Sequence, residues 1–166
     1  MKLIALSELA KETALKAGNF LLSQKLEPKK VESESGRDIK LELDIKTEQL
    51  IRKELKASNI SVQGEELSSS AFEKLRWVVD PIDGTANYFR GLDQCCVSIA
   101  LMDMDECLIG VIYNFNTNEL YEATKGHGAK LNNRPITVSS ITEKNKASLT
   151  TGFPASETVD SSYDFL

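Results

Sequence analysis

The sequence predicts an α+β fold in which helices form a layer against a mostly antiparallel sheet. Three observations favour this fold. Apolar residues recur at helical spacing in residues 7–26 and 43–56, whereas later residues form short apolar runs typical of strands. Short polar links join the later strands, and such links suit antiparallel pairing because a parallel crossover needs about a dozen residues or more. At 166 residues, the chain is long enough to bury a substantial core as one domain.

Two helices are expected first. Residues 7–26 place leucines and alanines on one face, and Ser7 is a suitable N-cap for them. Residues 27–38 are polar, lack periodicity and contain a glycine, so we expect a mobile loop there. A second helix fits residues 43–56, and the helical period puts Asp44 near the face that packs inward.

Strands are expected from residue 59 onwards. Residues 59–66 have the pattern of a short strand that ends at a glycine and two acids, and residues 75–80 that of an apolar strand ending at Asp80. Three further strands are expected at 96–103, 106–114 and 119–125, followed by a turn and one more short strand within 126–139, and by the start of another within 147–154.

Composition and charge argue against several classes of protein. The net charge of −5 argues against nucleic acid as the main partner, although a bound divalent cation could still attract a small phosphorylated ligand. The three cysteines, two of them adjacent, do not suggest a secreted disulfide framework or a zinc site. No run approaches the ~20 apolar residues of a membrane span, and the N-terminus is too charged for a signal peptide. We therefore expect a cytoplasmic protein.

Residues 77–88, WVVDPIDGTANY, run from an apolar strand into two carboxylates, Asp80 and Asp83. If the GEE sequence at 64–66 lies nearby, four carboxylates gather, which costs free energy unless a cation lies between them. Oxygen ligands without histidine or cysteine favour Mg²⁺, or Mn²⁺ or Ca²⁺, and the carbonyl of Ile82 is a further candidate ligand.

The Gly-Thr pair that follows suggests a phosphate site. Gly84 would let the backbone approach a ligand closely, and free N–H groups at the start of a helix or turn in 84–89 would bind an anion. Thr85 would orient or deprotonate water if a carboxylate lies behind it, and Asp44 is the candidate. The pattern suggests metal-assisted hydrolysis of a phosphate ester. On spacing alone a solvated acidic turn remains the alternative, since such sequences are common in turns.

Four motifs in order resemble the inositol monophosphatase family of Mg²⁺-dependent, lithium-sensitive phosphatases. DPIDGTANY at 80–88 resembles its D-P-I/L-D-G-T-x-N-F/Y signature, and GEE at 64–66 its upstream G-E-E element. DIKLELD at 38–44 is similar to its D-x-V-T-x-x-D element, although Leu41 replaces the usual threonine. Residues 96–133, which end in GHGAKLNN, resemble the stretch after the signature.

The resemblance implies a fold like the N-terminal half of the family's α/β sandwich, with two or three Mg²⁺ ions at the site. Glu65, Asp80 and the Ile82 carbonyl would hold one ion and Asp80 with Asp83 a second, while Glu65 would help to hold a third. The loop at 28–37 would close over the site. Glu66 is expected behind the ligands rather than among them.

The catalytic and substrate-binding residues implied by the resemblance overlap with these ligands. Asp44 and Thr85 would polarise the attacking water, with Glu65 as the third catalytic residue, and Asp83, Gly84 and Thr85 would bind the substrate phosphate. The expected enzyme is a homodimeric phosphomonoesterase acting on inositol 1-phosphate. The alternatives are 3′-phosphoadenosine 5′-phosphate and fructose 1,6-bisphosphate as substrates.

One departure from the family concerns a later W-D-x-A element whose aspartate completes the second metal site. The single tryptophan, Trp77, belongs to the signature strand. We therefore expect residues 1–145 to form an N-terminal α+β metal-binding domain and 146–166 to begin a second α/β portion that is cut short. Asp160 and Asp164 stand in no motif and are expected to be solvated. The non-enzyme alternative is a metal- and phosphate-binding half that acts as an assembly or regulatory module.

Overall fold

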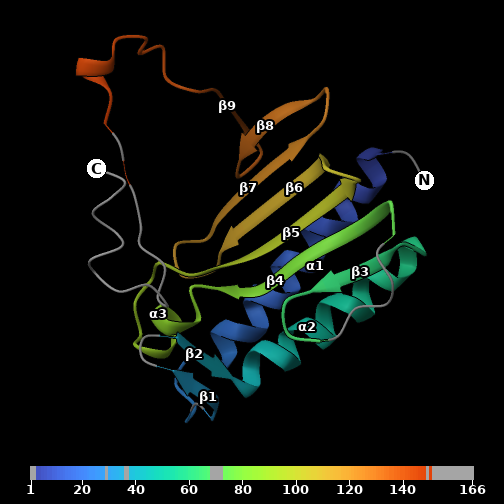
Figure 1. Cartoon of the computed structure of the whole chain (residues 1–166), viewed down its shortest axis with the longest axis vertical. Helices are drawn as coiled ribbons and strands as arrows, with labels where there is room; N and C mark the ends of the chain where they lie inside the picture. Colours follow the sequence, from blue (N-terminus) through green and yellow to red (C-terminus); the bar gives the residue numbers. More distant parts are fainter. Residues whose placement is uncertain (1–2, 29, 36–37, 68–72, 149, 151–166) are drawn as a thin grey trace.

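The computed structural model describes residues 3–28, 30–35, 38–67, 73–148 and 150 (Figure 1). A seven-stranded sheet has the spatial order β3-β4-β5-β6-β7-β8-β9, and helices α1 (Leu3–Ser23) and α2 (Glu42–Leu55) pack against it. The predicted α+β layering is therefore confirmed. Asp160, Asp164 and most of the predicted second portion lie outside the described residues.

The two long helices agree with the sequence, except at the start of α1. This helix begins at Leu3, so Ser7 is not its N-cap. Ser7 instead lies buried on the inner face, where its Oγ accepts a hydrogen bond from Thr124 Oγ1 at 3.0 Å. The apolar residues before Ser7 are good helix formers, which explains the earlier start. In α2, the predicted inward face is confirmed, since Asp44 is only 1% exposed.

The loop predicted for residues 27–38 is wrong in its central part. Strands β1 (Val31–Ser35) and β2 (Asp38–Leu41) pair antiparallel as a separate two-stranded sheet. Val31, Glu32 and Ser33 of β1 are exposed, and Val31 is the single apolar residue of this strand, so no apolar alternation marks it in the sequence. β2 leads directly into α2 and lies beside the short helix α3 (Thr85–Phe89).

The main sheet follows the predicted strands closely. Every neighbouring pair is antiparallel except β3–β4, which is parallel. One short strand was expected within residues 126–139, but two are present, because Asn132 and Asn133 both have positive φ and make a two-residue hairpin turn. The strands are β3 (Ser61–Gly64), β4 (Leu75–Asp83), β5 (Cys96–Asp103), β6 (Glu106–Asn114), β7 (Glu119–Thr124), β8 (Gly128–Leu131) and β9 (Arg134–Ile136).

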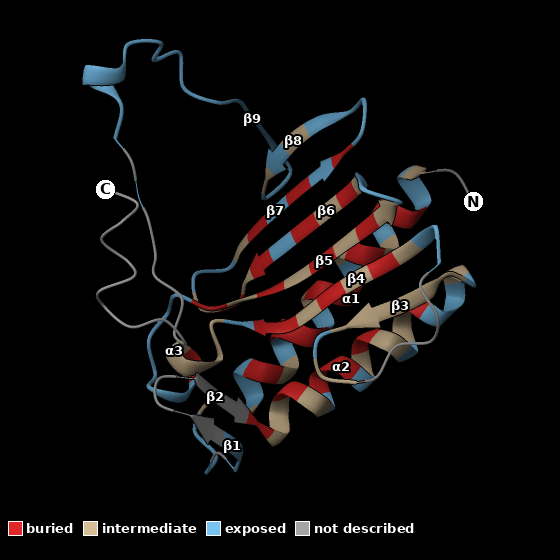
Figure 2. Cartoon of the chain, viewed as in Figure 1, coloured by how far each residue is buried: buried red, intermediate tan, exposed pale blue. Residues whose placement is uncertain are grey.

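The core lies between the helices and one face of the sheet. Buried and more exposed residues alternate along β4 to β7, as the red bands of Figure 2 show. Trp77 is fully buried there, and its Nε1 donates to Ser58 Oγ at 3.0 Å. Within the described ranges, no helix is long and apolar enough to cross a membrane. Ile82, within the acidic motif of β4, still belongs to this core, so the motif adjoins it directly.

Candidate active site

Strand β4 does not stop at Asp80, as the sequence predicted, but continues to Asp83. Its pairing with β5 shifts register between these two residues, which marks a bulge. Pro81 lacks an N–H and cannot donate to the neighbouring strand, so irregular pairing here has a local cause. The backbone N–H of Ile82 donates to Asp80 Oδ1 at 3.1 Å, and the Ile82 side chain is buried. The bulge therefore fixes the positions of both aspartates.

A left-handed glycine turns the chain from β4 into α3. Gly84 has φ of 86°, and a Cβ there would lie 2.8 Å from the carbonyl oxygen of Gln94. Only glycine meets both conditions without strain. Asn87 Nδ2 donates to the same Gln94 oxygen at 2.7 Å, which ties α3 to the segment before β5. The structure thus confirms the helix or turn expected at residues 84–89.

Thr85, the first residue of α3, contacts Asp44, the third residue of α2. Thr85 Oγ1 lies 3.0 Å from Asp44 Oδ1 and 2.8 Å from the carbonyl oxygen of Ile82. Asp44 Oδ2 accepts the backbone N–H of Leu41 at 2.7 Å, which satisfies a free donor at the start of α2. The leucine that replaces the usual threonine is a buried core residue, and its backbone holds Asp44. Thr85 and Asp44, predicted as a pair, are therefore in contact.

Burial raises the pKa of Asp44 to about 6, and the charge of Glu66 adds to the shift. The hydrogen bonds from the Leu41 amide and the Thr85 hydroxyl act in the opposite direction, because they stabilise the carboxylate. Asp44 is therefore ionised above neutral pH and can accept the threonine proton. In this state the Thr85 oxygen keeps a lone pair for a donor such as water.

Glu65 and Asp80 lie side by side where the pairing of β3 with β4 ends. The parallel pairing of β3 with β4 ends with Gly64 opposite Val79, so the next residue of each strand is an acid. The pKa of Asp80 is raised to about 7, and burial is the largest cause. The charges of Glu65 and Asp83 and a hydrogen bond with Glu65 raise it further. Both acids line an open pocket of about 290 Å³, together with Gln63, Gly64, Val78, Val79, Ser98 and Ala100.

These carboxylates fit a hard cation by their chemistry. The donors are all oxygens. The raised pKa of Asp80 means that burial and, after it, the neighbouring charges disfavour its ionised form, which a cation would stabilise. In the described part of the chain, however, no three or more His, Cys, Asp or Glu side chains are already arranged to hold a metal ion. The expected ligand set also includes a main-chain carbonyl, that of Ile82. The ligand roles of Glu65, Asp80, Ile82 and Asp83 stay predictions.

Two neighbours of the site were not assigned a role from the sequence. Cys96 pairs with Asp83 across β4 and β5, and its Sγ lies 3.7 Å from Asp83 Oδ2. Burial and the charge of Asp83 raise the pKa of this thiol to about 12. Glu48 is fully buried and accepts the backbone N–H of Glu66 at 2.8 Å. Its position four residues after Asp44, on the same inward face of α2, is the signal that could have identified it.

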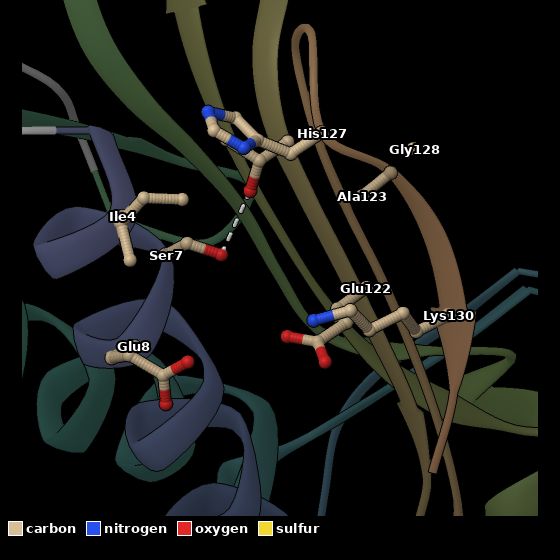
Figure 3. A pocket seen from close by; sticks show the side chains of 9 residues that line it. Ile4, Ser7, Glu8, Glu122, Ala123, His127, Gly128 and Lys130 are labelled. Carbon is tan, nitrogen blue, oxygen red and sulfur yellow. Dashed lines mark hydrogen bonds between the residues drawn. The ribbon is translucent and has the colours of Figure 1, made fainter. Parts of the chain in front are cut away.

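A second pocket of about 70 Å³ lies on other elements, between α1 and the β7–β8 turn (Figure 3). The buried Glu122 lines it, and Lys11 Nζ lies 3.5 Å from Glu122 Oε2. His127 stands at its edge, exposed in the turn, and its N–H donates to the Thr124 carbonyl at 2.8 Å. This agrees with the turn that the sequence predicts at the start of residues 126–139. The volume suits about two water molecules.

The order of these motifs along the chain matches a known family. The sequence model of the inositol monophosphatase family matches residues 3–164. The chain belongs to this family. Among curated relatives, the Nus factor SuhB of Xylella fastidiosa is 40% identical over 150 residues, which cover 88% of this chain and 54% of that protein. Inositol monophosphatase 3 of Solanum lycopersicum is 38% identical over 87% of this chain and 56% of its own length.

Solved structures of the inositol monophosphatase family have the same fold. The extragenic suppressor protein SuhB from Bartonella henselae matches with a TM-score of 0.77 at 32% identity, over 82% of this chain and 55% of that one. The inositol monophosphatase from Anabaena matches with a TM-score of 0.73 at 28% identity, over 86% and 53% of the two chains. The chain therefore spans about half the length of the relatives that it matches.

Proposed function

We propose that the chain is part of a Mg²⁺-dependent phosphomonoesterase that hydrolyses inositol 1-phosphate or a similar small phosphorylated substrate. The contact that carries this proposal is the 3.0 Å hydrogen bond from Thr85 Oγ1 to Asp44 Oδ1. The same hydroxyl lies 2.8 Å from the carbonyl oxygen of Ile82, the residue between Asp80 and Asp83 in the acidic motif. A hydroxyl backed by a buried carboxylate is suited to polarise water. Inositol monophosphatases of Solanum lycopersicum and Rhizobium meliloti are 38% and 32% identical to the chain.

The residues of the site divide into two groups by their proposed roles. Glu65, Asp80, Asp83 and the Ile82 carbonyl would hold Mg²⁺. When bound, Mg²⁺ supplies positive charge that activates water and stabilises the leaving oxygen. Asp44 would take up or share the Thr85 proton, so that the threonine oxygen orients the attacking water towards phosphorus.

The start of α3 would receive the substrate phosphate. The backbone N–H groups of Gly84 and Thr85 precede the first hydrogen bonds of this helix, whose earliest donors are the N–H groups of Asn87 and Tyr88 to Gly84. These two N–H groups would donate to the phosphate oxygens. Asp83 and its ion would hold the phosphate from the other side. We also propose that the enzyme is inhibited by Li⁺, works in the cytoplasm and forms a homodimer.

Fructose 1,6-bisphosphate is a second candidate substrate. A solved structure described as an inositol monophosphatase–fructose 1,6-bisphosphatase is 30% identical to the chain, with a TM-score of 0.69 over 81% of it. Comparing phosphate release from the two substrates under one Mg²⁺ concentration distinguishes them.

The deciding experiment is phosphate release from inositol 1-phosphate with and without Mg²⁺. We expect Mg²⁺-dependent release that falls to background in Asp83→Asn. A conservative control is Asp105→Asn, which changes an exposed turn residue between β5 and β6. Release that is unaffected by Asp83→Asn would contradict the proposal.

Binding without turnover is the non-enzyme candidate. It would use the same carboxylates, because a cation beside Glu65 and Asp80 would relieve the raised pKa of Asp80 whether or not a substrate is hydrolysed. Tight Mg²⁺ binding with no release of phosphate from any phosphomonoester would support this role as an assembly or regulatory module.

A further inference from the structure

The carboxylate of Glu48 is buried between α2 and the end of β3. Its Oε2 accepts the backbone N–H of Glu66 at 2.8 Å and that of Leu67 at 3.3 Å, and its Oε1 lies 2.7 Å from Arg52 Nε. A buried carboxylate that accepts several donors, one of them charged, is held firmly in one place.

Arg52 contacts the same segment, residues 62–67, on both sides of Glu65. Its Nη1 donates to the carbonyl oxygen of Val62 at 2.8 Å, and its Nη2 donates to that of Leu67 at 3.3 Å. The planar guanidinium is suited to hold several acceptors in fixed directions at once. Glu48 and Arg52 therefore bind the backbone both before and after the exposed Glu65.

The glycine of the GEE sequence is matched to this carboxylate. A Cβ on Gly64 would lie 2.0 Å from Glu48 Oε1 and 2.4 Å from Oε2, distances that no real contact permits. Gly64 does not have a positive φ, so no turn requires glycine here. What requires it is the close approach of the Glu48 side chain to the backbone next to Glu65.

We propose that Glu48, together with Arg52, is a positioning residue for Glu65. The inference rests on the proposed function, in which Glu65 and Asp80 bind Mg²⁺. The sheet fixes the backbone of β3 only as far as Gly64, where its pairing with β4 ends. Beyond that point, the bonds from Glu48 and Arg52 hold the 62–67 segment so that the Glu65 carboxylate faces Asp80.

The position of the Glu65 carboxylate is important because of the geometry that Mg²⁺ requires. The ion demands near-ideal octahedral geometry, so a ligand that moves weakens binding strongly. Replacing residues that orient metal ligands typically costs roughly 10- to 100-fold in affinity. Glu48 touches neither the ion nor the substrate in this proposal, and acts only through Glu65.

The test compares Glu48→Gln and Arg52→Lys with the control Glu54→Gln. Glu54 is on the same helix and pairs with Lys16 at 2.5 Å, away from the 62–67 segment. Two quantities are measured: amide hydrogen exchange at Glu66 and Leu67 in the metal-free chain, and Mg²⁺ affinity by titration calorimetry. Hydrogen exchange tests whether Glu48 and Arg52 fix the backbone of residues 62–67. Calorimetry tests whether this affects the affinity for Mg²⁺.

We expect faster exchange at Glu66 and Leu67 and a Mg²⁺ affinity reduced roughly 10-fold or more in Glu48→Gln, with Glu54→Gln like the parent chain. Arg52→Lys keeps the charge beside Glu48 but cannot reach both carbonyls, so it should show a smaller loss, and it serves as the test if Glu48→Gln does not fold. If the parent chain binds Mg²⁺ and a folded variant binds it equally tightly, the inference about Glu48 is wrong, but the proposed function is not affected. A parent chain that binds no Mg²⁺ would overturn the proposed function, and the inference with it.

Discussion

The hydroxyl of Thr85 lies 3.0 Å from the carboxylate of Asp44, although 41 positions separate the two residues in the sequence. The left-handed Gly84 turns the end of β4 into α3 and thereby presents Thr85, while the N-cap at Leu41 holds Asp44 in the first turn of α2. A second contact of the same hydroxyl, 2.8 Å from the Ile82 carbonyl, competes for its one proton. Which acceptor receives the proton depends on the charge of Asp44.

Replacing Thr85 by valine should remove the proposed water-orienting group without changing the size of the side chain. We expect phosphate release to fall roughly 100-fold or more, as when a positioned proton-transfer group is lost. The pKa of Asp44 should rise further, because the Thr85 hydroxyl stabilises its ionised form. Carboxyl NMR titration measures this second effect without turnover. Thr85→Ser keeps the hydroxyl and should retain most of the activity; equal losses in both variants would contradict the role.

Much of this site follows from local sequence patterns. The helical period of residues 43–56 put Asp44 inside, and the apolar run before Asp80 gave the strand that carries the motif. What the patterns missed depends on contacts between distant segments. Ser7 looks like a cap but is buried against Thr124, and β1 has only one apolar residue, Val31, by which to recognise it as a strand. The helical period could place Glu48 on the inward face of α2, but its role could not be predicted, because its partners, the amides of Glu66 and Leu67, approach it only in the folded chain.

The metal-free chain should become less stable as the pH rises through neutrality. Asp80 and Asp44 have pKa values raised from 3.8 to about 7 and about 6, so folding favours their protonated forms. Their contribution to the free energy of unfolding is fully present below pH ~4 and is lost as the pH rises through 6 and 7. We expect a loss on the order of 2 kcal/mol between pH 4 and 8 from Asp80, after allowing for its partial exposure. Urea unfolding at several pH values measures it.

The variant Asp80→Asn isolates this contribution. It cannot ionise, so the fall in the free energy of unfolding between pH 5 and 8 should be smaller than in the parent chain. Asp105→Asn, in an exposed turn, should leave the slope unchanged. A slope that is the same in Asp80→Asn as in the parent would show that burial and the charges of Glu65 and Asp83 do not disfavour its ionised form.

Adding Mg²⁺ should reverse the loss of stability at high pH. Ligand carboxylates must be ionised to bind the ion, so Mg²⁺ competes with protons at Asp80 and should stabilise the chain more at pH 8 than at pH 5. Saturation at about 100 times the dissociation constant corresponds to about 2.7 kcal/mol. Thermal unfolding with increasing Mg²⁺ measures this, and EDTA should abolish the effect. Asp83→Asn should reduce the stabilisation at pH 8, whereas equal stabilisation in that variant would argue that the ion binds elsewhere.

Gly64 and Glu48 should be energetically coupled. Gly64→Ala places a Cβ 2.0 Å from Glu48 Oε1, so either the carboxylate or the backbone next to Glu65 must move, at a cost of about 1–3 kcal/mol in the free energy of unfolding. Glu48→Ala frees the space but releases the 62–67 segment. The double variant should therefore be less destabilised than the sum of the two single variants, with a coupling energy of about 0.5–3 kcal/mol.

Gly110→Ala is the matched control, because its new Cβ would have only Cys107 Sγ nearby, at 4.0 Å. This change in β6 should be tolerated and should add independently to Glu48→Ala. Denaturant unfolding of the four members of each cycle gives the coupling. If Gly64→Ala and Glu48→Ala also add independently, the close approach of Glu48 to the backbone would not be what requires glycine at position 64. If they are coupled as expected, the glycine of the GEE sequence serves the side chain that holds Glu65 in place.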